Sequence, residues 1–174
     1  MILNECTLKW FKIDERAKIP TKMDAAAGYD IYTIEDNVTI PAHTTYMFRT
    51  GLAVAPSEGY WLMAFDRGST GSKGLHVHCG VVDNDYRGEI FICIKNDNKY
   101  PVVITRNEEP GMHHTGEGDQ PFYSTYLVYS PDKAIAQLIP VAQPKTNSLE
   151  VSAEEWEELK NTERGEGKLG SSGK

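Results

Sequence analysis

The chain has 174 residues, with 18 Lys and Arg against 25 Asp and Glu, so its formal net charge is −7. This length corresponds to one domain, or one domain with a tail, and 40% hydrophobic residues suffice for a core. An acidic chain is a poor general binder of nucleic acid or anionic membranes, although a few focused cations can hold a small phosphorylated ligand.

The N-terminal residues 1–18 include acidic side chains and no small-residue cleavage site, so we expect no signal peptide. No apolar run approaches the ~20 residues that a membrane helix needs. Cys6, Cys79 and Cys93 are an odd set without close spacing, which argues against a disulfide framework. We therefore expect a protein of the reducing cytoplasm.

Short apolar runs recur at roughly ten-residue intervals, separated by Gly, Pro and polar turns, and they predict β-strands. Helical periodicity is confined to residues 152–160, where Ser152 and Glu155 form a capping-box pattern. The rhythm favours an all-β sandwich, barrel or jelly roll. The predicted strands cover residues 8–13, 29–34, 44–54, 60–65, 75–82, 89–96, 100–105, 124–129 and 135–141.

Two segments differ in character from the rest of the chain. Residues 105–122 are polar and turn-rich, which predicts an extended insertion over 98–131 between strands, with His113 and His114 on an exposed loop. Residues 161–174 are glycine-rich with almost nothing to bury. The predicted organisation is a β-domain over 1–160 followed by a flexible C-terminal arm over 161–174.

Residues 66–74 follow a predicted strand and combine glycines, hydroxyls and two cations in one turn. Backbone N–H groups in such a turn can form an anion nest, to which Arg67 and the serines add donors. A plain surface loop fits the composition about equally well. His76 and His78 share a strand face, but no CxxC accompanies them, so we favour ordinary strand residues over a zinc site.

Residues 80–89 are interpreted as a hairpin, because Asn84 and Asp85 supply turn chemistry between two apolar strands. This arrangement places Asp83 at a strand end near Tyr86, where a carboxylate could orient a water molecule. The tail after Arg164 fits a linker, or a segment whose backbone donors close over a phosphate chain.

These segments resemble the signature motifs of the homotrimeric deoxyuridine triphosphate nucleotidohydrolases (dUTPases), in their order and near their spacing. The resemblance runs from about residue 8 to the C-terminus. It implies a jelly-roll subunit, a three-fold trimer with shared sites, and hydrolysis of dUTP to dUMP and pyrophosphate, which keeps uracil out of DNA. The matching segments are 26–31, 66–74, 80–89, 134–138 and 164–173.

The resemblance also implies a role for individual residues near the nucleoside. Asp83 matches the carboxylate that orients and deprotonates the attacking water, and Tyr86 matches the ring under the deoxyribose. The backbone from about Val77 to Val82, including Gly80, would read the uracil edge and exclude a 5-methyl group.

Other matching residues would hold the phosphates. Arg67, Gly68 and Ser69 fall in the phosphate-binding loop, and Gln137 matches an amide near the α-phosphate. Magnesium would bridge the phosphates mainly through phosphate oxygens and waters, and Asp30 would hold a metal-bound water. The arm residues that would close over the substrate are Arg164, Leu169, Gly170, Ser171 and Ser172.

The chain departs from the family pattern at several positions. Gly68 stands where a serine usually follows the loop arginine, Ala134 replaces an arginine, and Leu169 replaces the aromatic that stacks on uracil. The insertion 98–131 is longer than in compact members, as in some viral ones. It suggests a phage or prophage origin, a cytoplasmic location in a bacterial cell or phage-infected host, and a surface for a protein partner.

Two other functions fit the same scaffold. A dCTP deaminase would need a glutamate as general acid and base, and that position falls at Cys93. A non-catalytic nucleotide-binding or regulatory protein would be expected to lack Asp83, which is present. Release of pyrophosphate or of ammonia from individual dNTPs would separate these alternatives.

Overall fold

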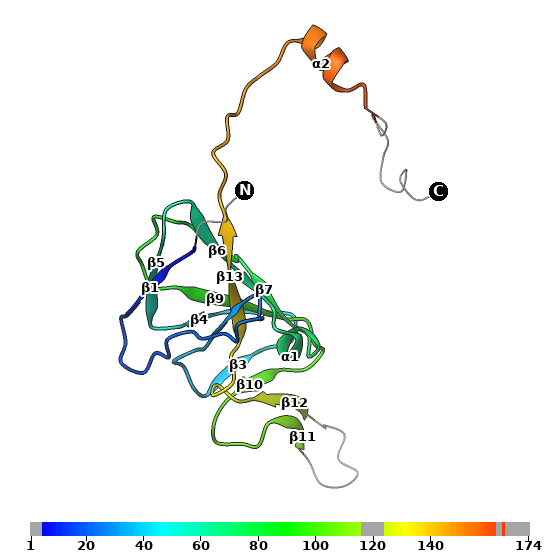
Figure 1. Ribbon diagram of the computed structural model, residues 1–174. Helices are drawn as coiled ribbons and strands as arrows, with labels where there is room; N and C mark the ends of the chain where they lie inside the picture. The colour runs from blue at the N-terminus through cyan, green and yellow to red at the C-terminus, as the bar shows by residue number, and fades with distance from the viewer. Residues whose placement is uncertain (1–4, 116–123, 163–164, 166–174) are drawn as a thin grey trace. The chain divides into compact units, whose positions relative to one another are not determined.

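The computed structural model describes residues 5–115, 124–162 and 165. The chain divides into two compact units, Met1–Gln143 and Pro144–Lys174 (Figure 1). The first unit contains β1 to β13 and the short helix α1 (Gly68–Gly71). The second contains α2 (Ala153–Leu159), in which Ser152 Oγ accepts a hydrogen bond from the Glu155 N–H at 3.2 Å, as the capping pattern predicts.

The strands of the first unit pair into several sheets, and their order differs from their order in the chain. The orders are β1-β5, β11-β12-β10-β3, β2-β13-β6-β8 and β4-β9-β7. Among the described residues, β10 and β12 are the parallel pair and the other pairs are antiparallel. The bounds are β1 (Leu8–Lys12), β2 (Tyr29–Ile31), β3 (Val38–Ile40), β4 (Thr45–Arg49), β5 (Leu52–Pro56), β6 (Tyr60–Phe65), β7 (Leu75–His78), β8 (Val81–Val82), β9 (Phe91–Asn96), β10 (Val102–Ile104), β11 (Gly111–Thr115), β12 (Ser124–Tyr129) and β13 (Ala136–Ala142).

A large core cluster joins the inward faces of these sheets, and a small second cluster contains Ala17, Ile34 and Leu52. In β9, burial alternates along the strand, so that Ile92, Ile94 and Asn96 point inward while their neighbours are more exposed. Ile92 and Ile94 pack with Phe48 from β4 and Leu138 from β13, both fully buried. Opposed sheets with alternating inward residues are the arrangement of a β-sandwich, which confirms the predicted all-β fold with two short helices.

Some predicted elements need correction. The run 44–54 is two strands, because Gly51 adopts a φ of 67° between β4 and β5. A Cβ atom at Gly51 would lie 2.9 Å from the Asp14 Cβ. The pattern missed β3, and it also missed β11, so His113 and His114 lie on a strand rather than on a loop. The polar sequence of β11 forms a strand because its backbone pairs with β12.

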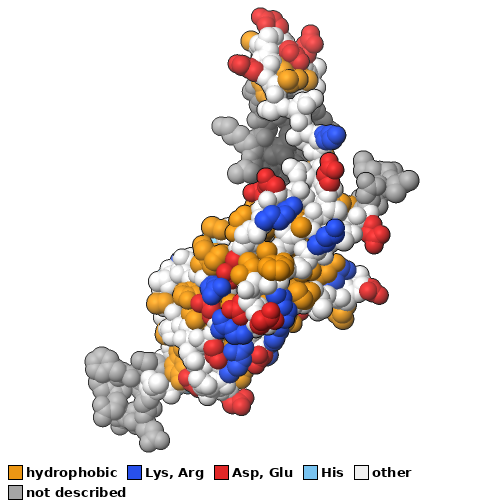
Figure 2. All heavy atoms as spheres, turned by 90° about the vertical axis from the view of Figure 1, so that its left-hand side faces the viewer, with side chains coloured by type: hydrophobic (Ala, Val, Ile, Leu, Met, Phe, Trp, Pro, Cys, Tyr) orange, Lys and Arg blue, Asp and Glu red, His pale blue; other side chains and the backbone are white. Residues whose placement is uncertain are grey.

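The surface of the molecule is mixed in charge. Figure 2 shows Lys and Arg side chains interspersed with Asp and Glu side chains on one face. Ion pairs of the first unit include Arg16 with Asp14 at 2.7 Å and Arg106 with Asp36 at 3.0 Å. Across the described part of the chain, no helix has the length and apolar character needed to cross a bilayer.

Candidate active site

The predicted phosphate loop is a short helical turn after β6. The hydroxyl of Thr70, which is buried, accepts from the Arg67 N–H at 3.0 Å and donates to the Arg67 carbonyl at 3.1 Å. These bonds tie the turn to the backbone of Arg67. The loop therefore presents the Arg67 side chain from a fixed backbone position.

The guanidinium of Arg67 forms a paired contact with Asp30 on β2. Nε donates to Asp30 Oδ1 at 2.8 Å and Nη2 donates to Oδ2 at 3.0 Å, and both side chains are about one-third exposed. The remaining terminal nitrogen donates to Ser69 Oγ at 3.2 Å. The family usually has a serine at the position of Gly68. In this chain the hydroxyl beside the arginine comes instead from Ser69.

Gln137 on β13 connects the phosphate loop to the first family motif, residues 26–31. It pairs with Asp30 across the β2–β13 register, and its Nε2 donates to the Asp66 carbonyl at 2.7 Å. The predicted residues Asp30, Arg67 and Gln137 therefore meet at one cavity of about 360 Å³. The full lining is Lys22, Met23, Ala26, Gly28, Asp30, Arg67, Gly68, Ser69 and Gln137.

The structure adds two residues that sequence reasoning missed here. Lys22 brings a second cation to the cavity wall. The only sequence signal for this role was its position four residues before the motif at 26–31. Tyr129 is buried beneath the loop, and its hydroxyl donates to the Ala134 carbonyl at 2.8 Å. Burial raises the pKa of Tyr129, while its contacts with Ser69 and Arg67 act in the opposite direction. No sequence pattern indicated this contact.

A second cavity, of about 210 Å³, contains the predicted catalytic and nucleoside residues. Gly80, Val82, Asp83 and Tyr86 all line it. The Gly80 carbonyl accepts from the Ala64 N–H at 2.7 Å, and a Cβ atom at Gly80 would lie 2.6 Å from the Ala64 oxygen. Only glycine fits this close backbone approach. Val77, by contrast, lies with Gly80 and Gln137 at a third cavity of about 460 Å³.

Asp83 begins a tight turn after β8. The Tyr86 N–H donates to the Asp83 carbonyl at 3.2 Å, which confirms the predicted turn. The predicted hairpin pairing is wrong, because β8 pairs with β6 whereas β9 pairs with β4 and β7. The turn is held by Asn84, whose Nδ2 donates to the Tyr60 carbonyl at 2.6 Å and to the Ser57 carbonyl at 3.0 Å.

The Asp83 side chain is exposed at the cavity wall. Within residues 5–115, 124–162 and 165, its carboxylate has no hydrogen-bond or ion-pair partner. Such a carboxylate is free to accept a proton from a water molecule. The arm residues Arg164, Leu169, Gly170, Ser171 and Ser172 lie outside the described residues.

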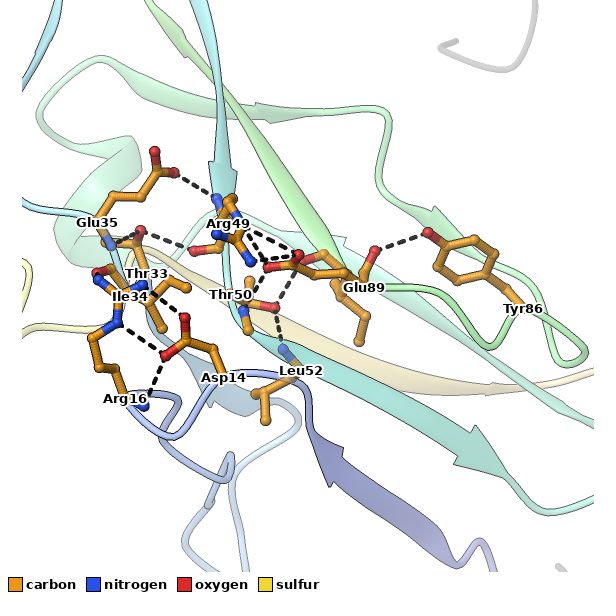
Figure 3. A network of polar contacts seen from close by, with 12 residues as sticks. Asp14, Arg16, Thr33, Ile34, Glu35, Arg49, Thr50, Leu52, Tyr86 and Glu89 are labelled. Atoms are coloured by element: carbon orange, nitrogen blue, oxygen red, sulfur yellow. Dashed lines mark hydrogen bonds and ion pairs between the residues drawn. The ribbon is translucent and has the colours of Figure 1, made fainter.

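A polar network fixes Tyr86 and the end of the turn (Figure 3). The Tyr86 hydroxyl donates to the Glu89 carbonyl at 2.8 Å. The Glu89 carboxylate accepts from Arg49 Nη2 at 3.0 Å and from the Gly51 N–H at 2.9 Å, and the pairing with Glu89 raises the pKa of Arg49. Because Arg49 ends β4, the network ties the Asp83 turn to the core sheet.

The cavity around Asp83 and the cavity around Arg67 share no lining residue. Large apolar side chains beside Asp83 are exposed, including Met47 at 54% and Val81 at 58%. One chain therefore keeps Asp83 and Arg67 at separate cavities, although Gly80 and Gln137 meet at the third one.

Comparison with known proteins identifies the family. The dUTPase family model matches residues 15–109. The chain is 34% identical to the deoxyuridine 5'-triphosphate nucleotidohydrolase of Candida albicans over 97% of this chain and 89% of that protein. It is 31% identical to the same enzyme of Rattus norvegicus, over 98% of this chain and 69% of that protein.

Solved phage enzymes share the fold. The dUTPase of Staphylococcus bacteriophage 80alpha with dUPNHPP is 28% identical, with a TM-score of 0.69 over 97% of this chain and 99% of that one. A mutant dUTPase of S. aureus phage phi11, described with a structural Mg(II) ion, is 26% identical, with a TM-score of 0.62 over 83% of this chain and 96% of that one. The resemblance to phage members is thus supported, and this chain belongs to the dUTPase family.

Proposed function

We propose that this protein hydrolyses dUTP to dUMP and pyrophosphate, with Asp83 orienting and deprotonating the water that attacks the α-phosphorus. The observation that carries the proposal is an exposed carboxylate without a partner among the described residues, beside Tyr86, in a chain of the dUTPase family. Phosphoryl chemistry of this kind asks the protein mainly for positioning and charge stabilisation.

The cavity around Arg67 supplies the charge stabilisation. The Arg67 guanidinium is held by Asp30, yet the Arg67 side chain remains about one-third exposed, and Lys22 adds a second cation to the same wall. Ser69 and the backbone of the turn add donors. A triphosphate chain fits this set better than a neutral ligand does, because both cations gain from an anion between them.

Magnesium fits the residues present through water rather than through direct ligation. Among the described residues, no group of three His, Cys, Asp or Glu side chains could hold a metal ion. Asp30 uses one lone pair of each oxygen for Arg67, so its carboxylate still has lone pairs for a metal-bound water. When bound between phosphates, magnesium would neutralise their charge. The mutant phage phi11 enzyme is described with a structural Mg(II) ion, so a related protein binds this metal.

We further infer a homotrimer in which neighbouring chains complete each site. The separate cavities around Arg67 and Asp83, and the exposed Met47 and Val81 beside Asp83, support this arrangement. Three-fold closure would place the Asp83 cavity of one chain against another chain. The arm over 161–174 would then close the site, and the insertion over 98–131 would be free for a protein partner in the cytoplasm.

The deciding experiment offers each dNTP, and UTP, to the protein with magnesium and measures pyrophosphate and ammonia. We expect pyrophosphate from dUTP and little from dTTP, dCTP or UTP. Ammonia from dCTP would instead indicate a deaminase. The sequence disfavours that alternative, because Cys93 stands at the position of the required glutamate.

A further inference from the structure

Two of the three cysteines line the cavity that contains Asp83 and Tyr86. Cys79 directly follows β7, is exposed, and adopts a φ of 55°, which is uncommon for a residue with a side chain. Cys93 is half-buried in β9, opposite His78 in the β7–β9 register. Strands that are distant in sequence therefore bring both thiols to one wall of the nucleoside cavity.

The β7–β9 register brings the two cysteines close together. Cys93 lies directly opposite His78, Cys79 is the next residue after His78, and both line the same cavity. Burial, together with the neighbouring Cys79, raises the pKa of Cys93. In the described part of the chain, no third ligand makes a metal site with them. The remaining cysteine, Cys6, does not line this cavity.

We propose that Cys79 and Cys93 form a reversible disulfide inside the nucleoside cavity, and that the oxidised protein binds dUTP more weakly. The effect on dUTP rests on the proposed function. The formation of the disulfide depends only on the position of the two thiols.

The oxidant would be a low-molecular-weight disulfide such as glutathione disulfide. The thiolate of the exposed Cys79 attacks one sulfur, forms a mixed disulfide and releases one glutathione thiolate. The Cys93 thiolate then attacks the Cys79 sulfur, which forms the protein disulfide and releases the second glutathione thiolate. The two protons lost by the cysteines end on the two glutathione molecules, so the protein is oxidised by two electrons and glutathione disulfide is reduced.

The disulfide would change the cavity through Gly80. A disulfide holds its two sulfurs about 2.05 Å apart, closer than any two sulfur atoms that are not covalently bonded. Drawing Cys79 toward β9 displaces the adjacent Gly80, whose carbonyl is bonded to Ala64 at 2.7 Å without room for even a Cβ atom. The backbone that would read the uracil edge therefore moves. We expect the KM for dUTP to rise about tenfold, the usual loss in affinity for one hydrogen bond.

The test treats the folded, full-length protein with glutathione disulfide, blocks the remaining thiols with N-ethylmaleimide, and maps the peptides by mass spectrometry. We expect a Cys79–Cys93 linked peptide, lighter by two hydrogen atoms, with Cys6 alkylated. The KM for dUTP should rise, and dithiothreitol should restore it. Cys6→Ser should respond like the wild type. Cys79→Ser, compared with its own untreated sample, should not respond, whereas Cys93→Ser should stop at a glutathione adduct on Cys79 without a linked peptide.

Three outcomes would overturn the proposal: full alkylation of Cys79 and Cys93 after oxidation, a glutathione adduct that persists on Cys79 of the wild type, or a linked peptide with an unchanged KM. If the reduced protein releases no pyrophosphate, the proposed function fails instead. Peptide mapping then still tests the disulfide, and titration with a non-hydrolysable dUTP analogue tests its effect on binding.

Discussion

The Asp66 carboxylate lies 2.8 Å from His76 Nδ1, across the base of the phosphate loop. Its other oxygen accepts from the Val77 N–H, and the Asp66 carbonyl accepts from Gln137. Asp66 directly precedes Arg67, so this residue joins the start of the loop to β7 and β13. The family resemblance alone did not indicate this role.

Removing the Asp66 carboxylate should loosen the loop. We expect Asp66→Ala to lower the free energy of unfolding by about 2 kcal/mol, because the Val77 N–H loses a charged acceptor. The KM for dUTP should rise as well, with a smaller change in kcat. Asp66→Asn keeps an acceptor for Val77 and a donor for His76, so it should restore most of both properties. Urea unfolding and steady-state kinetics measure them, and equal behaviour of the two variants would contradict the role.

Asp83→Asn should lower kcat by ~10²–10⁴-fold, the usual cost of losing a general base. Because the side chain is exposed and lacks partners among the described residues, the unfolding free energy should not change. Asp85→Asn is the matched control, since Asp85 is an exposed carboxylate on the same turn and should tolerate the change. Near-normal turnover of a folded Asp83→Asn protein would remove Asp83 from the mechanism.

Arg67→Lys should raise the KM for dUTP by about tenfold or more, although the charge is kept, because an ammonium cannot reproduce the paired geometry. The matched control is Arg16→Lys. Arg16 pairs with Asp14 through two nitrogens in the same way, but it lies away from the cavities that contain predicted site residues. Steady-state kinetics measure the KM for dUTP of both variants. If the KM of Arg67→Lys equals that of Arg16→Lys, Arg67 does not bind phosphate.

The free energy of unfolding should fall at acidic pH, in part because the Asp36 carboxylate becomes protonated. Burial alone would raise the pKa of this carboxyl, but hydrogen bonds from the Arg106 side chain and backbone, and from the Asn37 N–H, lower it overall. A pKa lowered on folding contributes stability that is present above the unfolded value of about 3.9 and is lost as pH falls through the folded pKa. Asp36→Asn should therefore lose less stability than the wild type between pH 6 and pH 3. Urea unfolding at both values checks this, and identical losses would exclude Asp36 as a contributor.

Two inactive variants should rescue each other if sites are shared. Asp83→Asn, with an intact arm, and a protein truncated after Thr162 are unfolded and refolded together in equal amounts. Random three-fold rings are mixed in about three quarters of cases, and about a third of their sites are complete, so roughly a quarter of the activity should return. Pull-down with a tag shows that mixed trimers form. Mixed trimers without activity would place Asp83 and the arm of one site on the same chain.

Local chemistry made several elements predictable from the sequence. Ser152 caps α2 because its side chain reaches an N–H only three residues away, and the turn after Asp83 closes through neighbours. The apolar run over 89–96 predicted the strand that the structure shows as β9. The family motifs located Asp83, Arg67 and Gln137, and the structure places the last two at one cavity.

Only the tertiary structure decided which strands pair and which side chains meet. A period of two residues tells which face of a strand is buried, but not which strand lies beside it. For this reason β8 pairs with β6 instead of β9, and the polar strand β11 exists because β12 supplies its partners. The Asp66–His76 contact and the shared cavity of Cys79 and Cys93 depend in the same way on strands that are distant in sequence, so no local pattern could predict them.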